Sequence, residues 1–186
     1  MSSSTPTMTR QDAIERIARH ELEQLDVAER ESIIQDFWSI REDDPDYAAL
    51  GNELKTELSA AEGTEHPEHA RYDALILAAL RYDYVGTVNA YLEQRLEQLG
   101  QPKTRVEGMV EQLYTCPCCG YRTLESRGDY DICKVCRWED DYTNDPAHTS
   151  SPNGAMTLGE ARRRFATLGA IFEDGHRSKF AHEPSR

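Results

Sequence analysis

Four of the five cysteines form two pairs of the type Cys-x-x-Cys, and all five lie within residues 115–138. Cys116 and Cys119 make the first pair, Cys133 and Cys136 make the second, and thirteen residues separate the pairs. A two-residue gap lets one loop direct two sulfurs at one cation, and two such loops supply the four thiolates that tetrahedral zinc prefers. The spacing therefore predicts one structural Zn²⁺ held by these four residues.

Three other interpretations of the cysteines stay open. Two disulfides would suit a secreted protein, but the first ten residues lack the apolar stretch of an export signal. Iron also accepts four thiolates, and the softness of sulfur does not separate it from zinc. The cysteines can also be free and buried. Cys118, the fifth cysteine, is expected to be a packed or partly exposed bystander, since no histidine is near it in the sequence to lower its pKa.

Residues beside the two pairs are expected to support the site. Gly120 follows the first pair, where glycine adopts a positive φ without strain. Arg137 occupies the equivalent position after the second pair, so we expect the second loop to be the more strained. Trp138 is expected to pack over the metal and shield the sulfurs from water.

The residues between the pairs predict a β-hairpin. Residues 121–126 and 130–132 read as two short strands, and residues 127–129 contain a glycine suited to the turn. With one cysteine pair at each end, this arrangement predicts a zinc ribbon. A helix should follow, because Thr157 and Glu160 form a capping box ahead of a helical apolar pattern that ends near Gly169.

Three segments around the cysteines resemble one family. CPCCGYRTL, ICKVCRWEDD and NGAMTLGEARRRFATLGA occur in this order within residues 113–170. They resemble the bacterial cysteine-rich CPCC family, although Lys134 stands where that pattern commonly has proline. The resemblance implies a zinc-binding module without an established catalytic reaction.

An acidic cluster follows the second pair. Glu139, Asp140 and Asp141 can meet the arginines of the following helix in a charge-assisted clamp; these are Arg162, Arg163 and Arg164. Paired carboxylates can also perform acid–base chemistry, but no nucleophile, base or metal-ligand spacing accompanies them. We therefore favour the clamp and expect no catalytic residue.

The first half of the chain predicts a helical bundle. Apolar residues recur at helical spacing in five stretches, of which the third is expected to be one helix from Pro45 through Leu58. Together with the ribbon, this makes the chain α+β. The predicted ranges are a disordered tail over 1–8, the acidic bundle over 9–100, a linker over 101–109, the ribbon domain over 110–172 and a flexible tail over 173–186.

The charge of the chain favours a basic protein partner. The net charge is −13, of which −10 falls in residues 1–105 and −3 in the remainder. The negative electrostatic field of this charge repels phosphate backbones, which makes nucleic acid a poor partner. The same field attracts basic proteins. No apolar run is long enough for a membrane span. Cysteines arranged for a metal indicate the cytoplasm, and no small-molecule substrate is indicated.

These observations predict a non-catalytic zinc-binding module for protein interaction. One concrete version is an immunity or antitoxin-like protein whose acidic surface neutralises a basic toxin. A zinc-ribbon regulatory factor associated with nucleic acid or transcription is the first alternative, and it requires a basic stripe. An enzyme that uses Glu139, Asp140 and Asp141 is the second alternative.

Overall fold

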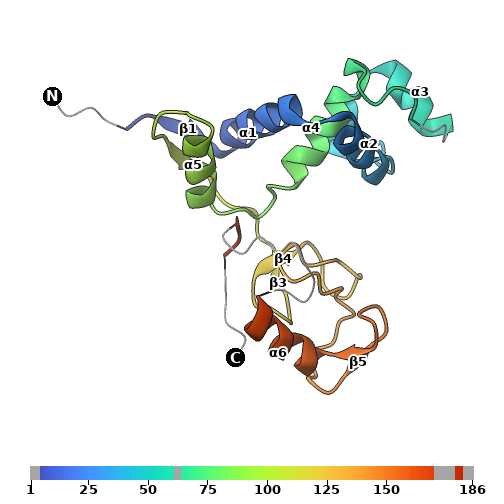
Figure 1. The fold of residues 1–186 in the computed structure, drawn as a ribbon, viewed down its shortest axis with the longest axis vertical. Helices are drawn as coiled ribbons and strands as arrows, with labels where there is room; N and C mark the ends of the chain where they lie inside the picture. Colours follow the sequence, from blue (N-terminus) through green and yellow to red (C-terminus); the bar gives the residue numbers. More distant parts are fainter. Residues whose placement is uncertain (1–4, 61–63, 170–178, 182–186) are drawn as a thin grey trace. The chain divides into compact units, whose positions relative to one another are not determined.

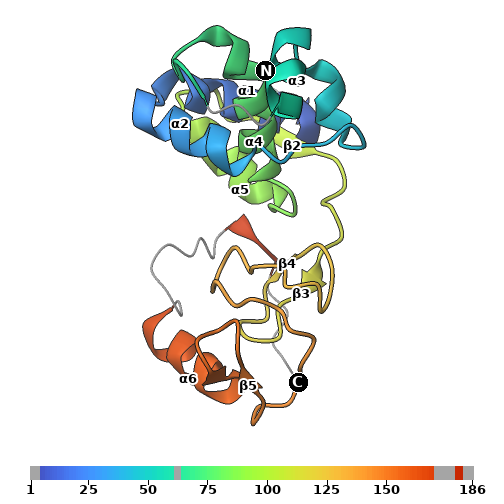
Figure 2. The ribbon, with the colours of Figure 1, turned by 90° about the vertical axis from the view of Figure 1, so that its right-hand side faces the viewer.

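The chain divides into two units. The computed structural model describes residues 5–60, 64–169 and 179–181. Unit 1 comprises Met1–Val85 and Leu92–Gly108, and unit 2 comprises Gly86–Tyr91 and Met109–Arg186. The elements of both units are shown in Figures 1 and 2. The parts of the predicted tails at residues 1–4, 173–178 and 182–186 lie outside the described residues.

Unit 1 is built around the helix α4. Its helices are α1 (Arg10–Gln24), α2 (Val27–Asp36), α3 (Asn52–Ala60), α4 (Asp73–Tyr82) and most of α5 (Asn89–Gln98), with short 3-10 turns η1 (Pro45–Ala49) and η2 (Ala70–Tyr72). Leu75 to Leu80 are buried along α4, which packs against α1 and α2 (Figure 1). Thr9 and Asp26 cap α1 and α2 through their side chains, as their residue types predict. Among the described residues, no helix is both long and apolar enough to cross a membrane.

The predicted third helix is interrupted. The 3-10 turn η1 ends at Ala49, and α3 begins at Asn52. Leu50 between them is extended, with φ −72° and ψ 144°, and its side chain is buried. Gly51 follows and has a low helix propensity. The prediction of one helix was wrong. The apolar residues keep their helical spacing across the break at residues 50–51, so the sequence pattern does not reveal it.

Two short strands lie in segments that were predicted to be irregular. The strand β1 (Thr7–Thr9) pairs in parallel with β2 (Arg105–Glu107). The predicted tail over 1–8 and linker over 101–109 thus contain ordered residues. Val106 is buried, and its N–H donates to Oε1 of Glu93 over 2.9 Å. A three-residue strand is too short for alternation to reveal it in the sequence.

The described residues beyond Met109 in unit 2 form two small strand pairs and the helix α6. The strand β3 (Tyr114–Thr115) pairs with β4 (Arg122–Leu124), and β5 (Thr149–Ser150) pairs with β6 (Met156–Thr157). The helix α6 (Leu158–Leu168) is shown in Figure 2. It begins with the predicted capping box, and its C-cap Gly169 has φ 85°. Phe180, in the predicted flexible tail, is 5% exposed and belongs to the core of this unit. Its burial has no sequence signal, since a single aromatic residue carries no periodicity.

Candidate metal centre

The first cysteine pair lies in the loop that joins β3 to β4. The N–H of Cys116 donates to the carbonyl of Tyr121 over 2.8 Å, and the N–H of Gly120 donates to the carbonyl of Cys116 over 3.0 Å. These bonds close the loop and leave both sulfurs on its inner side, where they are buried. Gly120 has φ 77°, the left-handed conformation that its position predicts.

The second pair repeats this construction. The N–H of Cys133 donates to the carbonyl of Trp138 over 2.8 Å, and the N–H of Arg137 donates to the carbonyl of Cys133 over 2.8 Å. Each bond has its counterpart in the first loop at the same spacing. Arg137 has φ 65°, so a residue with a Cβ occupies the position that glycine fills in the first loop. Arg137 thus adopts the left-handed conformation on which the prediction of greater strain in the second loop depends.

The strain at Arg137 can be tested by Arg137→Gly. Glycine adopts φ near 65° without the steric penalty of a Cβ, and the side chain of Arg137 is exposed. We expect the free energy of unfolding of unit 2 to rise by about 1 kcal/mol, measured by chemical denaturation. The matched change Gly120→Ala should lower it by about 1 kcal/mol or more. Equal effects of the two changes would contradict the assignment of strain.

The predicted hairpin is wrong in its second strand. The strand β4 pairs with β3 across the first loop, and the predicted strand over 130–132 contributes one isolated bridge, from Ile132 to Glu139. Tyr130 has φ 61°, which no β-strand residue can adopt. Gly128 has φ 72° and forms the predicted turn, but this turn does not join two strands. Each cysteine pair therefore lies in a hairpin-like loop of its own.

The four paired cysteines meet at one point. The sulfur of Cys116 lies 3.6 Å from that of Cys136, and the sulfur of Cys119 lies 3.5 Å from that of Cys133. All four sulfurs lie within 4.8 Å of one another. Four thiolates around one zinc ion would be separated by about 3.8 Å, given Zn–S bonds of about 2.3 Å. The cysteines are free rather than disulfide-bonded, and together they can hold one metal ion.

The four thiols must lose their protons to bind a metal ion as thiolates. Burial raises the pKa of Cys116 and, with hydrogen bonds to other thiols, that of Cys136. The pKa of Cys119 is raised too, because hydrogen bonds to Cys133 and Cys136 and burial outweigh the opposite effect of Cys116. Burial opposes the thiolate of Cys133 as well, but hydrogen bonds from the other three thiols and from Thr123 lower its pKa. The protein alone thus favours one thiolate, and four require a compensating cation.

Backbone and hydroxyl donors surround the sulfur of Cys133. The hydroxyl of Thr123 donates to it over 3.0 Å, and the N–H groups of Val135 and Cys136 donate over 3.4 Å each. Such donors spread the negative charge of a metal-bound thiolate. No local pattern in the sequence singles out Thr123, which lies in β4 and is 3% exposed.

We expect Thr123→Val to weaken metal binding by about tenfold at neutral pH. Without the hydroxyl, the pKa of Cys133 rises toward its usual range, so protons compete with the metal at higher pH. Metal release during acid titration should therefore occur at a higher pH than in the wild-type protein, as followed with a chromogenic chelator. Thr123→Ser retains the donor and should behave like wild type; equal behaviour of Val and Ser would contradict the role of this bond.

The core of unit 2 encloses the site. Trp138 is fully buried in the same cluster as all five cysteines, and Cys118 is 5% exposed within it. The cluster is completed by apolar residues from β4, the second cysteine loop, α6 and the chain beyond α6: Leu124, Val135, Leu158, Ala161 and Phe180. The sulfurs are therefore shielded from water, and a metal held by them would have no open position for a substrate.

The acidic residues beyond Trp138 contact groups other than those predicted. Asp140 is fully buried, and its Oδ2 accepts from Nε of Arg127 over 2.6 Å and from the N–H of Gly128 over 2.9 Å. Arg162 donates from Nε to the carbonyl of Pro117 over 2.9 Å and thereby joins α6 to the first cysteine loop. In place of the predicted clamp, Asp140 thus holds the turn at Gly128.

Asp141 and Glu139, on either side of Asp140, are also held by local contacts. The side chain of Asp141 is 8% exposed and lies 3.1 Å from Nε2 of His148. The backbone of Glu139 is bound at both ends by Asn153, whose Oδ1 accepts from the N–H over 2.9 Å and whose Nδ2 donates to the carbonyl over 2.8 Å. Asn153 was missed as a positioning residue, although the Asn-Gly pair at 153–154 marks a turn. Asp140 and Asp141 thus make structural contacts through their carboxylates, and Glu139 is held through its backbone.

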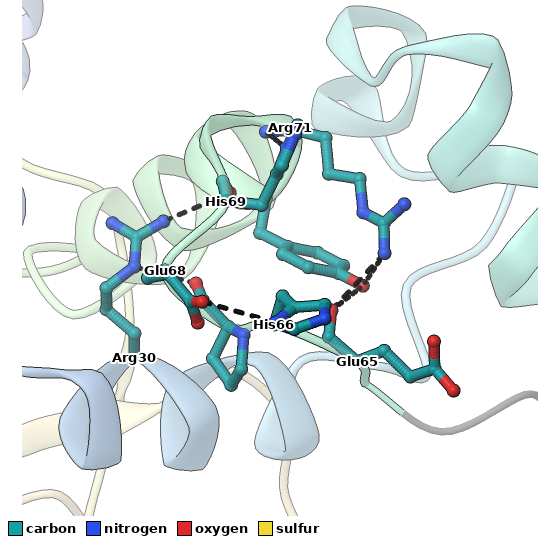
Figure 3. A network of polar contacts seen from close by, with 8 residues as sticks. Arg30, Glu65, His66, Glu68, His69 and Arg71 are labelled. Carbon is teal, nitrogen blue, oxygen red and sulfur yellow. Dashed lines mark hydrogen bonds and ion pairs between the residues drawn. The ribbon is translucent and has the colours of Figure 1, made fainter.

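His66 and His69 of unit 1 take part in a local polar network (Figure 3). Nδ1 of His66 lies 3.3 Å from the carboxylate of Glu68, and Nδ1 of His69 accepts from the N–H of Arg71 over 3.1 Å. Arg30 donates to the carbonyls of Pro67 and His69, which fastens this loop to α2. The loop is therefore a structural junction, with its histidines engaged locally.

Comparisons with known proteins agree with the cysteine geometry. Residues 114–185 match the family described as Cysteine-rich CPCC. No curated protein and no solved structure matches the chain. The match covers the two cysteine loops and α6, and the resemblance expected from the sequence is confirmed for this part of the chain.

Proposed function

We propose that the CPCC region is a structural Zn²⁺ module and that the chain acts by binding a basic protein through its acidic helical unit. The observation that carries the metal assignment is the set of four buried sulfurs within 4.8 Å of one another. Zinc suits this set because it favours tetrahedral thiolate coordination and undergoes no redox change. With four protein ligands the ion has no free position for a water molecule, so its role is to stabilise the fold.

The metal is identified by elemental analysis of the full chain, purified under reducing conditions without added metal. We expect one zinc per chain and negligible iron. Stoichiometric iron would contradict the zinc assignment, and the absence of any metal would contradict the metal module. A chelator should remove the ion only as unit 2 unfolds, since the sulfurs are 0–5% exposed.

The partner is proposed from charge. Residues 1–105 carry a net charge of −10, so long-range attraction favours a cationic protein surface. An immunity or antitoxin-like role is the most concrete form of this proposal, with the acidic unit covering the basic cleft of a toxin. Co-expression with the product of an adjacent reading frame should then yield a complex whose association rate falls steeply with salt. An association rate that is independent of salt would contradict an electrostatic partner surface.

A further inference from the structure

Unit 1 contains a pocket of about 520 Å³ at the end of α2. It is lined by the last residue of α2, the segment that follows it and the last residue of α4; the lining residues are Asp36, Phe37, Ser39, Ile40, Arg41, Asp43, Asp44, Pro45 and Tyr82. We propose that this pocket accepts an arginine side chain from a basic segment of the protein partner. This inference depends on the proposed function, because it assigns the place where the acidic unit recognises its partner.

An aromatic pair contributes to the apolar lining of the pocket, together with Ile40 and Pro45. The ring centroids of Phe37 and Tyr82 lie 5.8 Å apart, with an angle of 58° between the ring planes. Tyr82 is 41% exposed although it terminates a helix whose other apolar residues are largely buried. A planar guanidinium group can stack on an exposed ring and gain a cation–π interaction.

Carboxylates lie at the rim of the same pocket. Asp36 and Asp43 are exposed, and within the described part of the chain neither side chain makes a hydrogen bond or an ion pair. The carboxylate of Asp44 already has a hydrogen-bond partner within the protein, since its Oδ1 accepts from the N–H of Asp46 over 2.8 Å. Arg41 is the one basic residue among those that line the pocket. The rim therefore carries a net charge of −2, with two carboxylates available to a cation.

Arginine fits this combination better than lysine does. Its guanidinium is planar, can bind a carboxylate through two parallel hydrogen bonds and stacks on aromatic rings, while the lysine ammonium is a compact and strongly hydrated charge. A second hollow on unit 1, along α1, is lined by acidic residues together with Arg16, Arg19 and His20, and it contains no phenylalanine, tyrosine or tryptophan. It therefore lacks the pair of large aromatic rings that the pocket at the end of α2 offers to a guanidinium.

The test is calorimetric titration of the full-length protein with three twelve-residue peptides of alternating glycine and arginine, glycine and lysine, or glycine and glutamate. We expect the arginine peptide to bind about threefold or more tightly than the lysine peptide, and the glutamate peptide not to bind. Asp36→Asn with Asp43→Asn should weaken arginine-peptide binding about fivefold at low salt. Tyr82→Leu should weaken it about threefold and remove the preference for arginine.

The matched control is Glu53→Gln with Glu97→Gln, which changes the net charge equally at exposed positions outside the pocket. It should weaken binding by less than about twofold, since screened charges act weakly at a distance. If both double variants weaken binding equally, or if Tyr82→Leu leaves the preference for arginine intact, the pocket assignment is overturned while the acidic surface stands. If no cationic peptide binds the wild-type protein, the proposed partner chemistry itself fails.

Discussion

Cys136→Ser should unfold unit 2 and leave unit 1 folded. Replacing one thiolate removes a ligand and leaves three buried sulfurs without full compensation by the cation. Structural zinc sites contribute roughly 10 to 16 kcal/mol to the folding of small domains, more than the remaining apolar core of unit 2 can replace. The core of unit 1 contains no cysteine and is built from a separate cluster of residues, so its helices should persist.

The measurement uses the two tryptophans. In a Trp38→Phe background, Trp138 is the only tryptophan and lies fully buried in the cysteine cluster. Its emission should shift to longer wavelength in the Cys136→Ser protein, while far-ultraviolet circular dichroism retains most of the helical signal. The zinc content should fall from one per chain to nearly zero.

Cys118→Ser is the matched control. Cys118 is as buried as Cys119, but it is not one of the four cysteines whose sulfurs converge. The variant should retain one zinc and the native emission of Trp138, with a stability loss of about 1 kcal/mol from placing a hydroxyl in an apolar core. Loss of the metal in Cys118→Ser but not in Cys136→Ser would contradict the assignment of the ligands.

The ligands of the candidate site were predictable because metal chemistry restricts spacing. Two Cys-x-x-Cys pairs are a pattern that few other structures require, and Gly120 with its counterpart Arg137 revealed how the two loops correspond. The cross-chain contacts were not predictable in this way. The hydrogen bond from Thr123 to Cys133 and the burial of Phe180 have no local sequence pattern. Both depend on which distant segments of the chain come into contact.

In the fold too, elements with a strong local sequence signal were predictable, and features that depend on distant contacts were not. Helices with strong periodicity and caps, such as α1 and α6, begin at the expected residues. The prediction of a second ribbon strand at residues 130–132 was wrong. The β-propensity of these residues is overridden because Tyr130 adopts a positive φ, which the loop around Asp140 imposes. The carbonyl of Asp140 accepts from the N–H of Tyr130 over 3.1 Å, a contact made possible by the second cysteine loop. Local preference thus yields to the geometry around the site.

Arg127→Gln should destabilise unit 2 by about 3 kcal/mol, because it leaves the carboxylate of Asp140 buried without its charged partner. The side chain of Asp140 is 0% exposed and that of Arg127 is 25% exposed, so the acidic partner cannot regain water unless the turn opens. In a double-mutant cycle measured by denaturation, Arg127→Gln and Asp140→Asn should couple by more than about 1 kcal/mol. Arg164→Gln, at an exposed position of α6, is the matched control and should couple to Asp140→Asn by less than about 0.3 kcal/mol. Stronger coupling to Arg164 than to Arg127 would restore the clamp expected from the sequence and remove Arg127 as the partner of Asp140.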